Sequence, residues 1–453
     1  MIKSIIIIIF FVFLYQIYKG MSYQRCLWFI ASIVLINGGV ILITSPITVP
    51  FVKGIVLLAI IYYLFHQNQF IFNYREIPST IRHSLAIYLI SIIIISLLDS
   101  TAGLTEKVTL VINDFISTYI YIIFGFLLTK KSYDFDKMVT PMIFILISIT
   151  IYGLYNFITQ TNPYHELITV TYQSQSATFD SQMLILVGWD ERYRVNSTIS
   201  SPFDYGYYST VLGIVSVYGY YHNKKNKLIP LIGIICSLTG AVLCNCRTVL
   251  AVWIVSFIIY FFANTKLSKL PKTIITISAL AFASYFLIPM VQTSINNLLD
   301  LLTTGGSQGG SSIQMRILQL LSAIKIFLES PILGHGLNYI NRILGWGTET
   351  YTSTEDLAGF ESIIYQVMIE KGIVGIISIY LIIRNIIVYF RKMNKIDKNI
   401  SALGISITVA FLTYAIATGP LGSYPLSMFI IGILIKTTTL KYNEKASYHY
   451  PRI

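Results

Sequence analysis

A series of apolar segments along the whole chain constrains its fold more than any other feature. About thirteen segments approach the roughly 20 residues that a transmembrane helix needs. They are 5–19, 27–44, 51–66, 84–98, 108–128, 139–159, 204–221, 228–244, 248–263, 273–290, 372–390, 402–418 and 422–438. Two of them, 51–66 and 84–98, are short, and one could be re-entrant. Because backbone N–H and C=O groups in lipid must form their hydrogen bonds within the segment, we expect helices. The predicted fold is all-α and polytopic, with about 12–13 transmembrane helices in one membrane domain over residues 1–453.

The composition agrees with this fold. Only 11% of the residues are charged and 55% are hydrophobic, whereas a soluble chain has roughly a quarter of its residues charged. The first apolar segment begins almost at Met1 and is not followed by the small residues of a cleavage site. We therefore expect an uncleaved first span rather than a signal peptide.

The positive charge of the chain is concentrated in short connections between apolar segments. The formal net charge is +12, and the basic clusters occupy alternate connections. They contain Lys130, Lys131 and Lys137; Lys224, Lys225 and Lys227; Lys266, Lys269 and Lys272; and Arg391, Lys392, Lys395 and Lys398. The positive-inside rule places all of these connections, and the C-terminal tail, in the cytoplasm. This pattern disfavours a nucleic-acid partner.

Several sites of common chemistry are missing from the sequence. The four cysteines (Cys26, Cys236, Cys244 and Cys246) have no zinc spacing, so they are interpreted as small buried hydrophobic residues. There is no phosphate-binding Gly-x-x-x-x-Gly-Lys loop and no His-Glu-x-x-His helix. We expect no metal and no cofactor, and an enzyme of this kind would need a donor that is already activated.

Two long connections face away from the basic clusters, over about 160–203 and 291–371. Loops of this length in a compact protein are usually functional or disordered. The first is rich in aromatic residues. The second contains apolar residues at helical spacing, and Pro331 ends that pattern; we expect an amphipathic helix that can lie along the membrane surface. No internal repeat is visible, which weighs against transporters built from inverted repeats.

Three arginines near these connections are candidates for binding an anion. Arg194 precedes the segment 204–221, Arg247 opens the segment 248–263, and Arg316 opens the amphipathic helix. Guanidinium groups stay charged and bind phosphate in a bidentate manner, so three that converge would suit a pyrophosphate. The alternative is that each one reaches lipid headgroups or caps a helix. The nearby Asp204 is a further ionisable residue at this face.

Two other residues are candidates for a role in catalysis or binding. Glu361 is expected to begin the helix that leads into the segment 372–390. It is either an acid favoured by the helix dipole or a general base that deprotonates a sugar hydroxyl. His335 lies between two glycines and is either a turn residue or a substrate contact.

The order of these features resembles the O-antigen polymerase and ligase superfamily of bacterial membrane enzymes. The Arg194 segment is similar to the family's Arg-x-x-Gly-x-Phe-x-x-Pro-Asn, with Ser197 in place of glycine and Pro202-Phe203 in place of Pro-Asn. Cys246-Arg247-Thr248 is like the family's Ser-Arg-Thr. The third match combines Arg316, the segment Ser330–Gly336, Glu361 and the segment Glu370–Gly375. The resemblance covers about residues 190–380.

The resemblance implies a GT-C-like helical fold and metal-independent glycosyl transfer at the periplasmic face of the cytoplasmic (inner) membrane. The donor would be an oligosaccharide linked to undecaprenyl pyrophosphate, and the product a lipopolysaccharide or other surface polysaccharide. Arg194 and Arg316 would hold the pyrophosphate, Arg247 and His335 would contact substrate, and Glu361 would be the base. The lipid bilayer, a chain-length regulator and a flippase are the implied partners.

Three functions remain open at this point. A polymerase would move the growing glycan to the next lipid-linked repeat unit, and a ligase would pass the finished glycan to a lipid A core or a protein. Family ligases carry a His-Asn-x-x-Leu pattern where this chain has Glu361 and Ser362, which favours the polymerase. A transporter or flippase of lipid-linked sugars would instead require functional charges buried in the middle of its spans and internal symmetry.

Overall fold

The structure is a computed structural model, and it describes residues 2–43, 49–65, 74–172, 193–222, 226–264, 313–343, 362–417 and 424–449. The helices in these ranges are α1 (Ile2–Lys19), α2 (Ser22–Leu35), α3 (Phe51–Phe65), α5 (Ser79–Leu98), α6 (Leu104–Ser117), α7 (Ile120–Leu128), α8 (Asp134–Thr159), α9 (Pro163–Tyr172), α11 (Pro202–His222), α12 (Leu228–Leu243), α13 (Arg247–Asn264), α16 (Ile313–Glu329), α17 (Tyr339–Ile343), α18 (Ile363–Met393), α19 (Lys398–Ala417) and α20 (Tyr424–His449). Two short strands, β1 (Ile41–Ile43) and β2 (Val49–Pro50), pair in antiparallel fashion. The all-α prediction is confirmed.

Six described helices are long and apolar enough to cross a membrane: α1, α5, α8, α13, α18 and α19. Helices α6 and α7, which meet at a bend of 50°, pass the same test only together, as a broken span or a re-entrant loop. Helix α12 and residues 51–62 of α3 are apolar but shorter. The chain is therefore a multi-pass membrane protein. The predicted segment 273–290 lies outside the described residues.

The predicted segment 27–44 is too long. Helix α2 begins earlier, at Ser22, and ends at Leu35, where Ile36 turns to an extended conformation. The cause is Asn37, whose side-chain oxygen accepts a hydrogen bond from the Gly39 amide at 2.9 Å. An asparagine side chain that bonds two residues ahead favours a turn over a helix. The chain then continues into β1, so an apolar run alone gave the wrong helix end.

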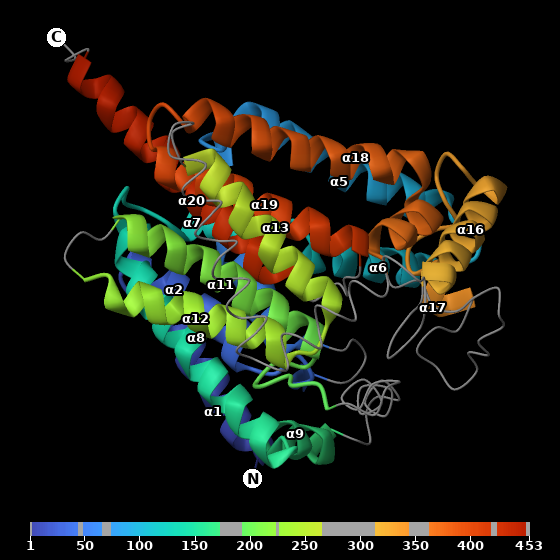
Figure 1. Ribbon diagram of the computed structural model, residues 1–453. Coiled ribbons are helices and arrows are strands. Elements are labelled where there is room, and N and C mark those ends of the chain that lie inside the picture. Colours follow the sequence, from blue (N-terminus) through green and yellow to red (C-terminus); the bar gives the residue numbers. More distant parts are fainter. Residues whose placement is uncertain are drawn as a thin grey trace.

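The spanning helices lie roughly side by side, and their connections gather at two ends (Figure 1). We call one the basic end: it holds the connections α7–α8, α11–α12 and α18–α19 and the C-terminal part of α20, toward the left of Figure 1. We call the other the loop end: it holds α9, α16, α17 and residues 193–201. The alternating basic connections that are described lie together at the basic end, as their pattern predicts.

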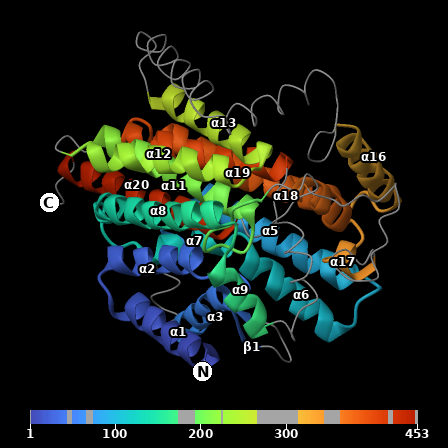
Figure 2. The same cartoon turned by 60° about the horizontal axis from the view of Figure 1, so that its bottom comes forward.

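The N-terminus lies at the loop end. The Lys3 ammonium is 5.4 Å from the centre of the Tyr172 ring, at the end of α9. In Figures 1 and 2 the start of α1 is likewise beside α9. Helix α1 therefore runs from the loop end toward the basic end.

Small residues let α7 and α20 cross in the core. A Cβ on Gly125 of α7 would lie 2.2 Å from the Phe429 carbonyl oxygen, and one on Gly432 of α20 would lie 2.1 Å from that of Ile122. Membrane helices associate through close packing of this kind, because lipid gives no hydrophobic driving force between them. The contact fixes α20, whose first residue, the buried Tyr424, lies toward the loop end.

Candidate functional site

The loop end is built on a break in α18. Gly372 has φ 58° and ψ −157°, a non-helical conformation inside the helix. The segment Pro331–Gly336 bridges this break. The amides of His335 and Gly336 donate to the carbonyls of Ile369 and Glu370 at 2.9 and 3.1 Å. In return, the amides of Ile373 and Val374 donate to the carbonyls of Pro331 and Ile332 at 2.9 and 3.2 Å. We call this four-bond contact the clasp.

Only glycine suits three positions of the clasp. Gly334, Gly336 and Gly372 have φ of 71°, 101° and 58°, and residues with a Cβ rarely adopt such angles. A Cβ on Gly334 would lie 2.4 Å from the Glu370 carbonyl carbon, and one on Gly336 would lie 2.3 Å from an Asp99 carboxylate oxygen. The glycines flanking His335 and the glycine of Glu-Lys-Gly are thus parts of one backbone contact.

The clasp also positions His335. Its Nε2 donates to the carbonyl oxygen of Ile326 in α16 at 2.8 Å. Its ring stacks on that of Tyr339 in α17, with the ring centres 4.6 Å apart. His335 therefore ties α16 and α17 to the clasp, which agrees with the interpretation as a turn residue.

A buried ion pair lies next to the clasp. Lys371, which directly precedes the break, donates to Asp114 of α6 at 2.6 Å and to the hydroxyl of Tyr88 in α5 at 3.0 Å. The Tyr88 hydroxyl donates to the same Asp114 carboxylate at 2.6 Å. The Lys371 side chain is 6% exposed and that of Asp114 16%. The three residues join α18 to α5 and α6 close to the α6–α7 bend.

A second ion pair fastens α17 to the α5–α6 connection. Arg342 donates to Asp99 at 2.6 Å, and the other Asp99 oxygen accepts from the Thr101 amide and hydroxyl at 2.8 and 2.6 Å. Burial opposes ionisation of Asp99, but the hydrogen bonds from Thr101 and Arg342 outweigh it and lower the pKa of this carboxyl below its usual value. Asp99 thus stays ionised at neutral pH.

The predicted arginines Arg194 and Arg247 lie in a different group of elements. The Val195 amide donates to the Leu243 carbonyl at 3.2 Å, which places the Arg194 segment beside the end of α12, a few residues before Arg247. The Arg194 guanidinium lies 5.8 Å from the centre of the Phe203 ring, and Arg247 is the first residue of α13. The structure therefore brings the segments of these two arginines to the same part of the loop end.

Buried polar side chains hold the Arg194 segment in place. The side-chain nitrogen of Asn162 donates to the side-chain oxygen of Asn196 and to the Ser197 carbonyl, both at 2.7 Å. The Ser197 hydroxyl donates to the Ile149 carbonyl at 2.7 Å. His165 of α9 lies between Asn37 and Asn196, and its burial lowers its pKa despite the nearby Glu166. A neutral His165 is therefore part of this support.

Asp204 is buried in the first turn of α11. The hydroxyl of Tyr414 in α19 donates to its carboxylate over a long 3.5 Å. The Tyr414 ring stacks on Tyr207 with centres 4.3 Å apart, and the Tyr207 hydroxyl is 2.6 Å from that of Ser427 in α20. Asp204 therefore faces the interior between α11 and α19.

The remaining predicted site residues are placed only in part. Arg316 lies in the first turn of α16, as predicted, but its side chain lies outside the described residues, and so does all of Glu361. The start of α18 is nevertheless clear. Its N-cap is Ser362, whose hydroxyl oxygen accepts from the Ile364 amide at 3.2 Å. The helix therefore begins at Ile363 rather than at Glu361 as predicted, because serine is a strong N-cap.

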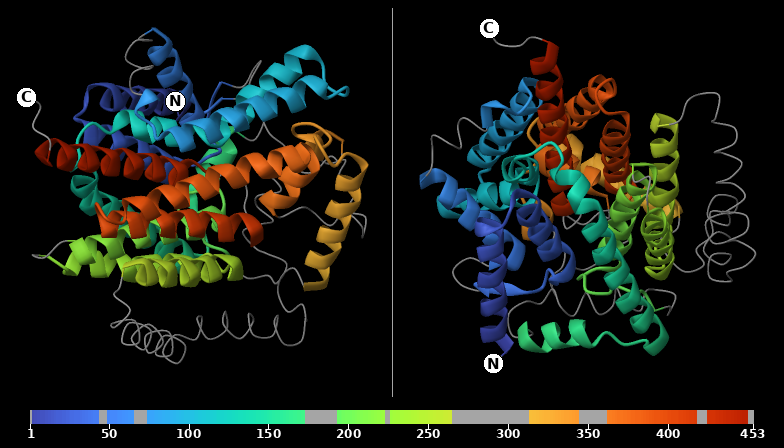
Figure 3. Two further views of the ribbon diagram at one scale, coloured as in Figure 1. Left: turned by 90° about the horizontal axis from the view of Figure 1, so that it is seen from above. Right: turned by 90° about the vertical axis from the view of Figure 1, so that its left-hand side faces the viewer.

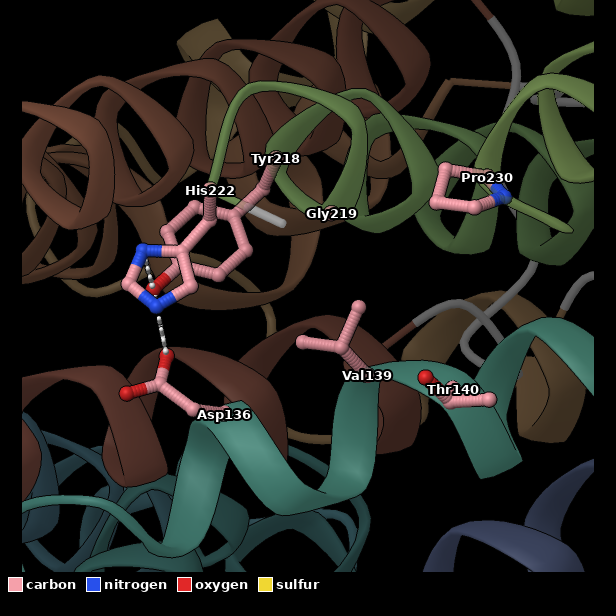
Figure 4. A pocket seen from close by; sticks show the side chains of 7 residues that line it. All are labelled: Asp136, Val139, Thr140, Tyr218, Gly219, His222 and Pro230. Carbon is pink, nitrogen blue, oxygen red and sulfur yellow. Dashed lines mark hydrogen bonds and ion pairs between the residues drawn. The ribbon is translucent and has the colours of Figure 1, made fainter. Parts of the chain in front are cut away.

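A cavity lies at the opposite, basic end, near the start of α8 and the end of α11; Figure 4 shows the side chains that line it. It has a volume of about 270 Å³ and is lined by α8, α11 and α12. On its wall the Tyr218 hydroxyl donates to Asp136 at 2.6 Å, and His222 lies 3.5 Å from the same carboxylate oxygen. The predicted site residues do not line it, so we assign it no part in the chemistry proposed below.

A fold of apolar spanning helices, with a broken helix at one end, defines a multi-pass membrane protein. Residues 232–380, from α12 into α18, match the family model described as O-antigen ligase. This match confirms the resemblance to the O-antigen polymerase and ligase superfamily and supports a glycosyl-transfer enzyme of that general type. No curated protein matched the sequence. The matched range includes Arg247, Arg316, His335 and Glu361, whereas Arg194 precedes it.

The sequence reasoning missed both ion pairs of the loop end. Lys371 and Arg342 are single basic residues near apolar segments, and their partners Asp114 and Asp99 are far away in the sequence. One signal was present: Asp114 falls inside the predicted segment 108–128, where a carboxylate is expensive in lipid and implies a partner. The identity of that partner follows only from the fold.

Proposed function

We propose that the protein is a polysaccharide polymerase of the bacterial cytoplasmic membrane, with its loop end facing the periplasm. A hydroxyl of the next lipid-linked repeat unit attacks the anomeric carbon of the growing glycan. The bond between that carbon and the pyrophosphate of undecaprenyl pyrophosphate breaks, and the pyrophosphate leaves with the bonding electrons. The hydroxyl proton passes to a base.

The family match over residues 232–380 supports an enzyme of this general type, and Glu361-Ser362 in place of the His-Asn of family ligases is the observation that favours the polymerase. The arrangement of the loop end supports it. The segments of Arg194 and Arg247 adjoin there, and Arg316 lies in the first turn of α16, which packs on the start of α18. Guanidinium groups at one end of the bundle suit a lipid pyrophosphate, whose charged group stays at the membrane surface.

Each predicted residue has a role in the proposed reaction. Arg194 and Arg316 stabilise the leaving pyrophosphate, and Arg247 adds a further charge-assisted contact. Glu361, one residue before the N-cap of α18, is the base. Because His335 Nε2 already donates to Ile326, a substrate contact of His335 would use Nδ1.

The second candidate is a ligase, and the description of the family model favours it. The two enzymes differ in the acceptor. The gel profile of surface polysaccharide, with and without this gene, separates them. For a polymerase, deletion reduces a ladder of long chains to a core with a single repeat. For a ligase, surface glycan disappears while lipid-linked polymer accumulates. An unchanged ladder, with no second gene that substitutes, would contradict both.

A transporter or flippase is the third candidate. The buried Lys371–Asp114 pair is a feature that such proteins often have, but the matched family supports an enzyme. A flippase mutant would accumulate single lipid-linked repeat units on the cytoplasmic side. Purified protein that lengthens a lipid-linked glycan in detergent would contradict the transporter, since no membrane is then crossed.

Complementation of the deletion with variants tests the arginines. We expect Arg194→Ala, Arg247→Ala and Arg316→Ala to insert normally and to lose about 10²–10³-fold of the polymerising rate, which is typical of a lost transition-state donor. Lys325→Ala on the exposed face of α16 is the matched control and should keep the full ladder. Full activity of Arg316→Ala would remove the pyrophosphate role of this residue.

A further inference from the structure

Helix α16 contacts the rest of the protein through one face, which includes Gln319, Ala323 and Ile326. Gln319 and Ala323 are 2% and 0% exposed, and Ile326 packs beside them. These positions follow each other at helical spacing, so they form one face. That face meets Tyr339 and Ile340 of α17 and Ile369 of α18.

Five large aliphatic side chains of α16 point the other way. Ile317, Leu321 and Leu328 are 51%, 56% and 65% exposed, and Leu320 and Ile324 are 38% exposed. At 100° per residue these five side chains form one continuous apolar face. In water a helix buries its large apolar residues against the protein, so the arrangement of α16 is reversed.

A third face of α16 carries its charged residues, with Leu318, which is 45% exposed, between them. Lys325 and Glu329 are exposed and lie about 90–120° around the helix from the middle of the apolar face. The helix thus has one side for protein, one that is apolar, and one for water. A helix at the boundary between lipid and water has this division.

The apolar face of α16 continues into the lipid-facing surface of the bundle. Ile332, just after α16, is 65% exposed, and its carbonyl accepts from the Val374 amide of α18. From that point Ile373, Ile377 and Tyr380 form an exposed stripe down α18 at 44%, 50% and 61%. Because α18 is a candidate span, lipid that covers this stripe would also reach the apolar face of α16.

The direction of α16 fits a membrane surface. In the left view of Figure 3, α16 (residues 313–329) runs across the direction of the spanning helices at the loop end. Figure 1 shows the same relation to α18. A helix perpendicular to the spans lies parallel to the plane of the bilayer.

We propose that α16 lies flat in the leaflet nearest the loop end, with Ile317, Leu321 and Leu328 among the acyl chains. The occupant of the apolar face is therefore phospholipid. Resting on the proposed function, this anchor has a consequence for the reaction. It holds Arg316, in the first turn of α16, at the depth of lipid phosphates, where the pyrophosphate of the donor must also lie.

Spin labels at two positions of α16 test the anchor. Leu321→Cys and Lys325→Cys are labelled in the full chain and reconstituted into nanodiscs of phosphatidylethanolamine and phosphatidylglycerol. Collisions with oxygen, which dissolves in lipid, are compared with those of a water-soluble nickel chelate. The unmodified protein gives the background from the native cysteines, of which Cys26, Cys244 and Cys246 are buried and Cys236 is half-buried.

We expect the label at residue 321 to collide mainly with oxygen, at a depth of roughly 5–10 Å below the headgroups. The label at residue 325 should collide mainly with the nickel chelate. Equal access of the chelate to both positions would overturn the proposal. Protection of residue 321 from both reagents would also overturn it, since a second copy or another protein segment would then cover the face.

A second variant separates the anchor from the reaction. Leu321→Ser and Leu328→Ser together should weaken the anchor and lower polymerase activity, with the helix still clasped to α18. If the label at residue 321 collides mainly with oxygen and this variant keeps full activity, the anchor is confirmed. The proposal that the anchor positions Arg316 for the reaction is then wrong. If the labels report lipid and the unmodified chain polymerises nothing, the anchor stands and the proposed function fails.

Discussion

The two ends of the bundle are both held by ion pairs, but these pairs are buried to different degrees. At the basic end, Lys441 bonds Asp397 with side chains 21% and 16% exposed, and it lies 3.8 Å from Asp136. A second pair at that end joins Lys436, 7% exposed, to Glu76, 36% exposed. At the loop end Lys371 and Asp114 are 6% and 16% exposed, and Asp99 and Arg342 are 2% and 13% exposed. One partner of each loop-end pair is therefore almost fully shielded from water, whereas both partners of the Lys441–Asp397 pair keep some contact with it.

This difference matches what each end must do. At the basic end the pairs join connections between intact helices, and water can replace a lost partner. At the loop end they hold a broken helix, α18, against a bent pair, α6 and α7. Unsatisfied groups there would face lipid or protein, where they cost several kcal/mol. We expect substitutions at the loop end to have the larger effects.

The largest effect should come from Lys371→Met. It leaves the Asp114 carboxylate buried without its ammonium partner, and breaking a buried pair from one side costs about 3–5 kcal/mol. Thermal unfolding in detergent, followed by intrinsic fluorescence, measures the loss. The double variant Lys371→Met with Asp114→Leu removes both charges and should be much closer to the wild type. A single variant as stable as the wild type would show that this pair is not shielded from water.

The clasp should be the next most sensitive feature. Gly336→Ala puts a Cβ at φ 101° and 2.3 Å from the Asp99 carboxylate, and the backbone strain alone is worth about 1–2 kcal/mol. Gly103→Ala is the matched control, because no atom lies within 4 Å of its added Cβ. Both are compared by the same unfolding measurement. Equal stability of the two variants would contradict the close contact at Gly336.

The comparison also explains which parts of the molecule the sequence predicts. The length of the apolar segments predicted the spanning helices, because backbone groups in lipid must form hydrogen bonds within a helix. It failed at Asn37, where one side chain ends α2 early. The helical spacing of apolar residues predicted α16, and Pro331 predicted its end, which is at Glu329. These features depend on neighbours in the sequence, and such features were the ones predicted well.

The candidate site was predicted in its residue types but not in its supports. Arg247 was expected at a helix start and is the first residue of α13. Its relation to Arg194 depends on one backbone hydrogen bond, between Val195 and Leu243, that no local pattern encodes. Likewise, the pairing of Lys371 with Asp114 joins residues far apart in the chain. Long-range pairing of this kind is decided by helix packing and has no local signal.

A smaller effect should appear on acidification of the loop end. Burial lowers the pKa of His165 below its ordinary value of 6.5, so the folded protein binds a proton less readily than the unfolded chain. Stability is then greatest above pH 6.5 and falls as the pH drops below it, by about 1.4 kcal/mol for each unit that separates the two pKa values. Unfolding measured from pH 7.5 to 5 tests this. In His165→Gln this part of the pH dependence should vanish; an unchanged profile would locate its source elsewhere.

The smallest effect is expected at the basic end, for Lys441→Met. The Asp397 carboxylate resists ionisation through burial, but bonds from Lys441 and the Ile400 amide lower its pKa below the usual value. Because the Ile400 bond remains and water reaches the site, removal of Lys441 should cost less than about 1 kcal/mol. What remains of this stabilisation is present above about pH 4 and is lost as the pH falls below it. Unfolding at low and high salt measures the loss, which salt should reduce further. A cost as large as that of Lys371→Met would mean that the two ends are equally shielded, and the distinction drawn between them would not hold.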